Sequence, residues 1–351
     1  MPNRLSHVLT AWALILGPGA AWAQTPAKPA GATSVAPVTV EGAAPKAVHK
    51  EAQSYVDAYT VPTAKIEQIG RWREPICVQV VNLPAEQAAV IRTRVEEVAK
   101  DLGVLVRPPG CTSNIQIVLT GQPQAFVDTV AKNNEHALGF HYPSDLKKAK
   151  TVTHPIQGWY KTATQGSKID HDGLPFAYTT GSGGVSGGPG EKVNDPNDPT
   201  AHPQGDANLP GEVHYAEIVD LPENGSPPGC AGSLINHCMR SVFKNVLVVV
   251  DAHAVEGKSL GALADYVTMM SLSQAKSLDG CSALPSIMDL MAKSPCPRRD
   301  PPDQLTAADA SFLTALYASN PEASAASEQV DIAGRMSETL VKASTTVQAS
   351  K

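Results

Sequence analysis

The apolar run Val246–Val250 limits the fold of this chain more than any other feature of the sequence. A strand without polar residues on either face must be covered on both faces, so the run predicts an interior strand of a sheet. We expect this strand to extend over 240–253. After Gly257 the periodicity becomes helical, and the predicted core stripe of that helix consists of Leu260, Leu263, Val267 and Met270.

Two strand–helix units precede this region. The first joins a strand at Ile76–Val81 to a helix that ends at Gly103, and the second joins a strand at Ile115–Leu119 to another helix. This order favours a pair of parallel strands, and a further strand is expected at 155–160. The predicted core-facing residues of the two helices are Ile91, Val95, Val98 and Leu102 in the first and Phe126, Val127 and Val130 in the second.

The C-terminal part of the chain is predicted to be helical. Thr306 is expected to begin a helix, because Asp309 three residues later forms a variant of the capping box. A last amphipathic helix carries Ile332, Met336 and Leu340. Since strands and helices are both expected, the sequence predicts the α+β class, with a mixed sheet packed against helices.

Composition narrows the classes of function. The 351 residues include 28 Lys and Arg and 34 Asp and Glu, and a net charge of −6 provides no large basic surface for nucleic acid. Gly and Pro are so frequent in 166–211 that we expect an insertion loop there. This loop contains Gly184–Gly188, which matches the nucleophile elbow of hydrolases. We interpret the match as chance, because neither a strand nor a helix is expected beside it.

The N-terminus is predicted to be a secretory signal peptide. Arg4 precedes the apolar run Val8–Leu16, and small residues before position 24 indicate cleavage after Ala23. The run is too short to span a membrane, and no membrane span is expected in the mature chain. Residues 24–46 are predicted to be a disordered linker and 47–345 a single domain. The protein is expected in the periplasm or outside a bacterial cell.

The six cysteines of an exported chain indicate disulfides. Many connectivities are open, and we expect cysteines that are neighbours in sequence to pair. Metal ligation is the alternative, but no Cys-x-x-Cys pair is present. The expected pairs are Cys77–Cys111, Cys230–Cys238 and Cys281–Cys296.

Three short strings occur in the order found in secreted zinc peptidases. They are a central helix at Leu263–Met269, a turn at Ser286–Met288 and a helix at Leu305–Tyr317. In this order they resemble the metzincins, and the C-terminal strings resemble the matrixins in particular. The resemblance implies a zincin-like fold in which Met288 belongs to a methionine turn beneath the metal position.

The residues that would bind zinc in that family are replaced in this chain. Asp265 and Met269 stand where two histidines are expected, Tyr266 where the catalytic glutamate is expected, Leu272 at the turn glycine and Ala275 at the third histidine. A thioether is a poor zinc ligand, and a tyrosine with a pKa of about 10 is no general base at neutral pH. We therefore expect no metal and no other cofactor. The predicted role is non-catalytic, in binding or structure, with a protein or cell-envelope partner.

An enzymatic alternative stays open. Asp251, His253 and Glu256 follow the buried strand, and Asp251 and His253 would project from the same strand face. A hydrolase or metal-dependent site of unusual composition would then lie there, although a polar surface turn is the simpler explanation. Three further histidines lack ligand spacing on one element and are interpreted as surface residues: His136, His141 and His154.

Overall fold

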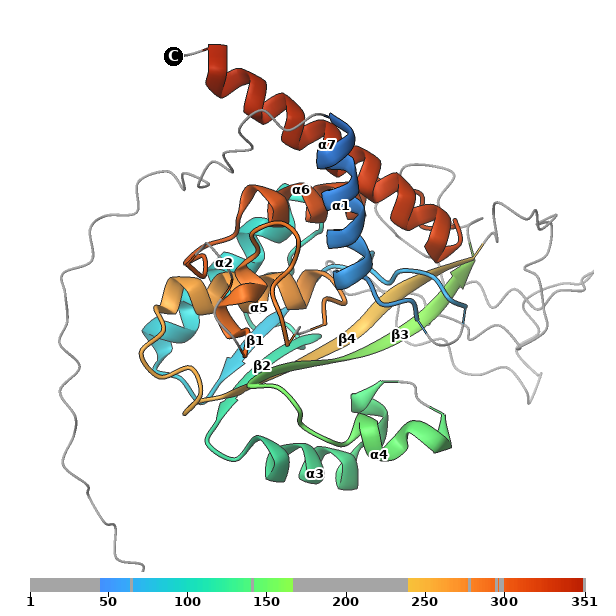
Figure 1. Ribbon diagram of the computed structural model, residues 1–351. Helices are drawn as coiled ribbons and strands as arrows, with labels where there is room; N and C mark the ends of the chain where they lie inside the picture. The colour runs from blue at the N-terminus through green and yellow to red at the C-terminus, as the bar shows by residue number, and fades with distance from the viewer. Residues whose placement is uncertain are drawn as a thin grey trace, which may run out of the picture. The chain divides into compact units, whose positions relative to one another are not determined.

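A four-stranded mixed sheet organises the described part of the chain (Figure 1). The structure is a computed structural model that describes residues 45–63, 66–139, 142–166, 239–276, 279–293, 296 and 300–349. The strands lie in the order β1, β2, β4, β3. Their bounds are β1 Val78–Val81, β2 Ile115–Thr120, β3 Ile156–Gly166 and β4 Met239–Asp251. The described residues combine α-helices with this mixed sheet, so the predicted α+β class is confirmed.

Strand β4 is an interior strand, as the apolar run predicts. It pairs in parallel with β2 and antiparallel with β3, and every residue of Val246–Val250 is buried. β4 ends at Asp251 and not at the predicted His253, because the chain turns directly after Asp251. β3 begins as predicted but continues to Gly166, so its pairing with β4 is longer than the sequence indicated.

The predicted parallel pair is also present, since β1 runs parallel to β2 with Val78 opposite Ile115. The disulfide Cys77–Cys111 joins the segments that lead into these two strands, with 6.1 Å between the Cα atoms. The side-chain oxygen of Asn114 accepts the backbone N–H of Cys77 at 2.7 Å. A second predicted disulfide, Cys281–Cys296, is present as well, and the third pair, Cys230–Cys238, lies outside the described residues.

Helices cover both faces of the sheet, which explains why the run Val246–Val250 of β4 is apolar on both sides. α3 (Pro123–Asn133) and α4 (Leu146–Ala149) lie on one face, and α2 (Ala85–Asp101) and α5 (Leu260–Leu272) lie on the other (Figure 1). The smaller core, beneath α3, consists of Val118, Val127, Leu138, Trp159, Leu247 and Val249. On α2, the predicted Ile91 and Val95 are buried, whereas Val98 and Leu102 are only partly buried.

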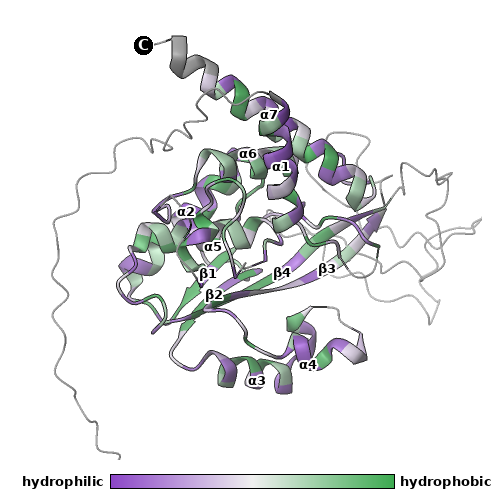
Figure 2. Ribbon diagram, viewed as in Figure 1, coloured by the Kyte–Doolittle hydropathy of each residue, from purple (hydrophilic) through white to green (hydrophobic). Residues whose placement is uncertain are grey.

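Three further helices pack outward of α5: α6 (Ala307–Ala318), α7 (Ala325–Ala349) and α1 (Pro45–Tyr59) (Figure 1). α6 begins with the predicted capping box of Thr306 and Asp309. α7 alternates between hydrophobic and hydrophilic residues (Figure 2), and it buries the predicted Ile332, Met336 and Leu340. α1 packs against α7. Because α1 begins at Pro45, the predicted linker is too long at its C-terminal end.

Short 3-10 helices complete the fold at η1 (Glu135–Leu138), η2 (Pro143–Asp145) and η4 (Ile287–Met291). Within the described ranges, no helix combines the length and the apolarity needed to cross a membrane. Several sequence predictions concern residues that the structure does not describe, and they stay predictions: the signal peptide 1–23, the linker up to residue 44, the insertion 167–211 with Gly184–Gly188, and His141.

A buried ion pair fixes α7 to the segment that precedes β1. The guanidinium group of Arg71 pairs with the carboxylate of Glu328, and both side chains are almost completely buried. Arg71 also donates hydrogen bonds to the backbone oxygens of Leu316 and Ser319. α7 therefore supplies the carboxylate that neutralises the buried guanidinium of Arg71. A buried guanidinium without a negatively charged partner would strongly destabilise the fold.

A buried polar network attaches α1 to the C-terminal half. The carboxylate of Asp309 accepts hydrogen bonds from the hydroxyl groups of Tyr55 and Ser286 and from the backbone N–H groups of Ile287 and Thr306. Burial raises the pKa of the Asp309 carboxyl, although these hydrogen bonds oppose the shift. One carboxyl group thus holds three segments together: α1, η4 and the beginning of α6.

We predict that Asp309→Asn lowers the free energy of unfolding by about 1–3 kcal/mol, because an amide offers one acceptor where several donors converge. The raised pKa also sets the sign of a pH effect. Folding favours the protonated carboxyl, so the advantage of the wild type should be largest at acid pH, below the ordinary pKa of an aspartate, and should fall as the pH rises through the raised pKa of the folded protein. Urea unfolding of both proteins at several pH values measures the difference. An advantage that grows with pH would mean that folding stabilises the carboxylate instead.

Candidate functional site

Helix α5 contains the positions that the family resemblance assigns to the metal site, and it is buried on all sides. Every residue from Ala262 to Leu272 is buried. The predicted Leu263, Val267 and Met270 do face the core, but the opposite side of the helix is covered as well, and Leu260 at its beginning is only partly buried. The prediction of a single core stripe is therefore wrong. α5 packs against α2, β4, η4 and α6, which leaves no face for solvent.

The positions that the resemblance assigns to zinc binding lie inside this packed interior. Asp265, Tyr266, Met269 and Ala275 are each at most 4% exposed. Met288, at the predicted methionine turn, is equally buried and belongs to the same hydrophobic core as Met269. The zinc that the resemblance implies does not fit these residues, because Asp265 offers the one carboxylate, Met269 offers a thioether, which is a poor zinc ligand, and Ala275 offers no ligand atom.

The carboxylate of Asp265 already has partners. Oδ1 accepts a hydrogen bond from Nε of Arg94 on α2, and Oδ2 accepts the backbone N–H of Leu305 at 2.8 Å. The Asp265 side chain is 6% exposed and that of Arg94 is 21% exposed, so this is a largely buried ion pair. Both oxygens are therefore engaged in joining α5 to α2 and to the segment before α6.

Three aromatic side chains donate hydrogen bonds to the C-terminal end of α5. The hydroxyl of Tyr160 on β3 donates to the carbonyl oxygen of Met270 at 2.9 Å. Nε1 of Trp72 donates to Ser271 at 2.7 Å, and the hydroxyl of Tyr317 on α6 donates to Leu272 at 2.8 Å.

These aromatic donors have a clear structural role. The last carbonyl groups of a helix have no partner within the helix, and they must be satisfied when the helix end is buried. Burial raises the pKa values of Tyr160 and Tyr317, so both phenols keep the protons that they donate. The carbonyl groups of Met270, Ser271 and Leu272 at the buried end of α5 therefore all have hydrogen-bond donors.

The segment that the resemblance assigns to a methionine turn is a short, capped helix. Ser286 and Asp289 form a capping box at the beginning of η4, in which the Ser286 hydroxyl accepts the N–H of Met288 at 3.1 Å. η4 packs against α5. The buried Met288 thus contributes to the core beneath α5, which is a structural role.

Asp251, His253 and Glu256 form a polar turn after β4. Oδ1 of Asp251 accepts the backbone N–H groups of His253 at 3.0 Å and Ala254 at 3.4 Å, an arrangement typical of a turn-capping aspartate. His253 and Glu256 are exposed. The expectation that Asp251 and His253 share a strand face is wrong, because His253 lies beyond the strand. Its ring instead lies against Gly121, where a Cβ atom would approach Nε2 to 2.8 Å.

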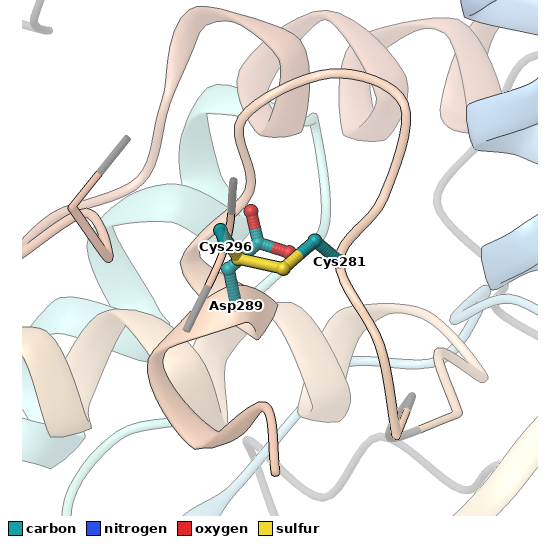
Figure 3. A group of neighbouring side chains, drawn as sticks. All are labelled: Cys281, Asp289 and Cys296. Carbon is teal, nitrogen blue, oxygen red and sulfur yellow. A yellow bond between two sulfur atoms is a disulfide. The ribbon is translucent and has the colours of Figure 1, made fainter. Parts of the chain in front are cut away.

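One group of metal-ligand side chain types occurs among the described residues: Cys281, Asp289 and Cys296, whose ligand atoms lie within 4.8 Å of one another. Figure 3 shows that the two sulfur atoms are bonded to each other, with Asp289 beside the disulfide. A disulfide offers no thiolate ligand. Asp289 also accepts the backbone N–H groups of Ser282 and Ser286, both at 3.2 Å. We interpret the disulfide and the Asp289 carboxylate as structural groups that hold the loop around η4 in place.

The described histidines also fit structural or surface roles. His136 is exposed in η1, and Nε2 of the partly buried His154 lies 3.2 Å from Oδ1 of Asp279. Neither lies on α5.

Comparison with known protein families, with curated proteins and with solved structures finds no match to this chain. The functional argument therefore rests on the geometry described above.

Sequence reasoning did not identify Arg94, the partner of Asp265. Arg94 follows the buried Ile91 by three residues and precedes the buried Val95, so its position beside the core was readable from the helical period. The choice of Asp265 as its partner was not readable, because that contact joins two helices that are distant in sequence.

We predict that Arg94→Ala lowers the free energy of unfolding by about 2–3 kcal/mol, because it leaves the buried carboxylate of Asp265 without its cation. Arg92→Ala is the matched control. Arg92 lies on the same helix, its side chain is 49% exposed, and its Nε lies 3.9 Å from Glu96. This substitution should cost less than about 1 kcal/mol. Equal losses in urea unfolding would contradict a structural role for the Arg94–Asp265 pair.

Proposed function

We propose that this chain is an exported, zincin-like protein that has no catalytic zinc site and acts by binding a partner. The proposal rests on the burial of helix α5 and on the hydrogen-bond partners of its polar groups. The positions that would hold zinc are buried, and the carboxylate among them is engaged by Arg94 and by the N–H of Leu305. A catalytic site needs an open position for water or substrate at the metal.

The order of elements supports the zincin-like fold. A mixed sheet is followed by the buried helix α5, then by η4 with Met288, and then by the capped helix α6 that ends near Tyr317. This is the order in which the three short strings resemble the metzincins. The support comes from the order of elements and from the packing of η4 beneath α5.

The disulfides Cys77–Cys111 and Cys281–Cys296 support export, because structural disulfides persist mainly in oxidising compartments. The alternative, an enzyme with a site at Asp251, His253 and Glu256, has less support. The Asp251 carboxylate caps a turn and does not orient the imidazole of His253, so the arrangement lacks the contact that an acid–base pair needs.

The mature protein, purified without chelator, tests this proposal. Elemental analysis after dialysis is expected to find no stoichiometric zinc. A variant with Asp265→His, Tyr266→Glu and Met269→His should also show no zinc-dependent proteolysis. The reason is that Ala275, at the position of the third ligand, has no atom that can bind zinc. Near-ultraviolet circular dichroism checks that the variant is folded.

About one tightly held zinc per wild-type chain would contradict the proposal. Zinc-dependent peptide hydrolysis by the wild type would contradict it as well.

A further inference from the structure

A pocket with a volume of about 680 Å³ lies beside the beginning of α7. The turn around Glu67 forms one side of it, residues 324–326 form another, and Tyr142 and Gln329 line it as well. Sites for small organic molecules commonly have volumes of about 300–1,000 Å³. The lining includes no residue of α5, so this pocket is separate from the positions discussed above.

A buried hydroxyl group at this pocket has no hydrogen-bond partner. Thr63 lines the pocket and is only 4% exposed. Its backbone groups pair with those of Gln68 and Glu67, but in the described part of the chain its side-chain oxygen has no hydrogen-bond partner. A buried polar group without a partner is destabilising, and its presence in a folded protein calls for an explanation. A ligand in the pocket would supply the missing partner.

Glu67 gives the pocket a negative charge. Its side chain is exposed, and within the described ranges its carboxylate takes part in no ion pair and no hydrogen bond. Neither Lys nor Arg is among the described lining residues. The N–H of Glu67 donates to the carbonyl of Thr63 at 2.9 Å, so the carboxylate and the buried hydroxyl belong to one turn. A carboxylate without a cation beside it favours a positively charged ligand.

The backbone at Glu67 is unusual for a residue with a long side chain, because φ is 50°. Asn82 is the other described non-glycine residue with a positive φ, and its side chain explains the conformation. Asparagine tolerates this region, and Nδ2 of Asn82 donates to the carbonyl of Leu119 at 2.9 Å. Glu67 makes no such contact. Asparagine or glycine would form the same turn with less strain, so the turn itself does not require a carboxylate.

The beginning of α7 also borders the pocket, and the N-terminal end of a helix attracts anions. Its N–H groups are partly engaged. That of Ala325 donates to the carbonyl of Glu67 at 3.2 Å, and that of Ser327 donates to the hydroxyl oxygen of Ser324 at 3.4 Å. A helix end carries about half an elementary charge, whereas an ionised carboxylate carries a full charge. The balance of charge at the pocket therefore favours a cation.

We propose that this pocket binds a small primary amine that carries an apolar arm. The ammonium group would pair with the carboxylate of Glu67 and donate a hydrogen bond to the hydroxyl oxygen of Thr63. The apolar arm would lie against Pro62, Ile66 and Tyr142. The proposal goes beyond the function proposed above, because it concerns a ligand site that does not depend on the zinc positions of α5.

Titration of the ¹⁵N-labelled full chain with 2-phenylethylamine at neutral pH, followed by NMR, tests the proposal. The amide signals that shift should belong to residues 62–69 and 324–329. Two compounds of similar shape test the charge preference: neutral 2-phenylethanol and anionic 3-phenylpropionate. Both should bind about three- to fivefold more weakly than the amine, as expected for the loss of one partly exposed ion pair.

Substitutions test the two polar groups separately. Glu67→Gln should weaken binding of the amine about three- to fivefold and leave binding of 2-phenylethanol unchanged. Thr63→Val should weaken binding of the amine about twofold, because it removes only the hydroxyl acceptor. Glu338→Gln is the matched control, since Glu338 is also exposed and lies on α7 but outside the pocket. It should change the affinity less than about twofold.

Glu67→Asn separates binding from folding. Asparagine adopts a positive φ more readily than glutamate, so without ligand the midpoint of urea unfolding should stay equal or rise. Binding of the amine should nevertheless weaken as much as in Glu67→Gln. A lower midpoint would show that the Glu67 side chain has a structural role, which would overturn the proposal.

Three further results would overturn it. They are preferred binding of 3-phenylpropionate, equal losses in Glu67→Gln and Glu338→Gln, and the absence of saturable shifts in residues 62–69 and 324–329 at millimolar amine. Failure of the proposed function is distinguishable from each of these, because zinc analysis and the proteolysis assay report on α5 and not on this pocket.

Discussion

Helix α5 is buried along almost its whole length, and this burial determines which side chains the surrounding elements must supply. A helix that is covered on all sides cannot leave its polar groups to water. The carboxylate of Asp265 therefore requires Arg94 from α2, and the last carbonyl groups require donors from β3, from α6 and from the segment that contains Trp72. Each donor comes from a different part of the chain, so α5 and its surroundings form one interdependent unit.

The outer helices also supply partners for buried polar groups. α1 supplies Tyr55 to the buried carboxyl of Asp309, and α7 supplies Glu328 to the buried guanidinium of Arg71. These contacts place two helices over the elements that pack on α5. The polar groups of this interior hold helices together, which is the physical basis for proposing a binding role.

Much of the fold could be predicted because its elements have strong local patterns. The apolar run Val246–Val250 identified the interior strand, and the capping box of Thr306 and Asp309 identified the beginning of α6. α1 was missed, although its buried residues follow the helical period: Val48, Ala52, Tyr55, Val56 and Tyr59. The candidate site was less predictable. The positions that the resemblance assigns to the zinc site could be named from the sequence, but the pairing of Asp265 with Arg94 depends on a contact between distant segments.

Native-state hydrogen exchange of the α5 amides tests most directly whether this helix is a sealed core element. If the aromatic and ionic partners hold it as described, the amides from Ala264 to Leu272 should exchange only through global unfolding. Their opening free energies should then equal the free energy of unfolding measured with urea. Opening free energies well below the global value would show that α5 is exposed by local motion, as expected for the wall of an accessible site, and would contradict the account.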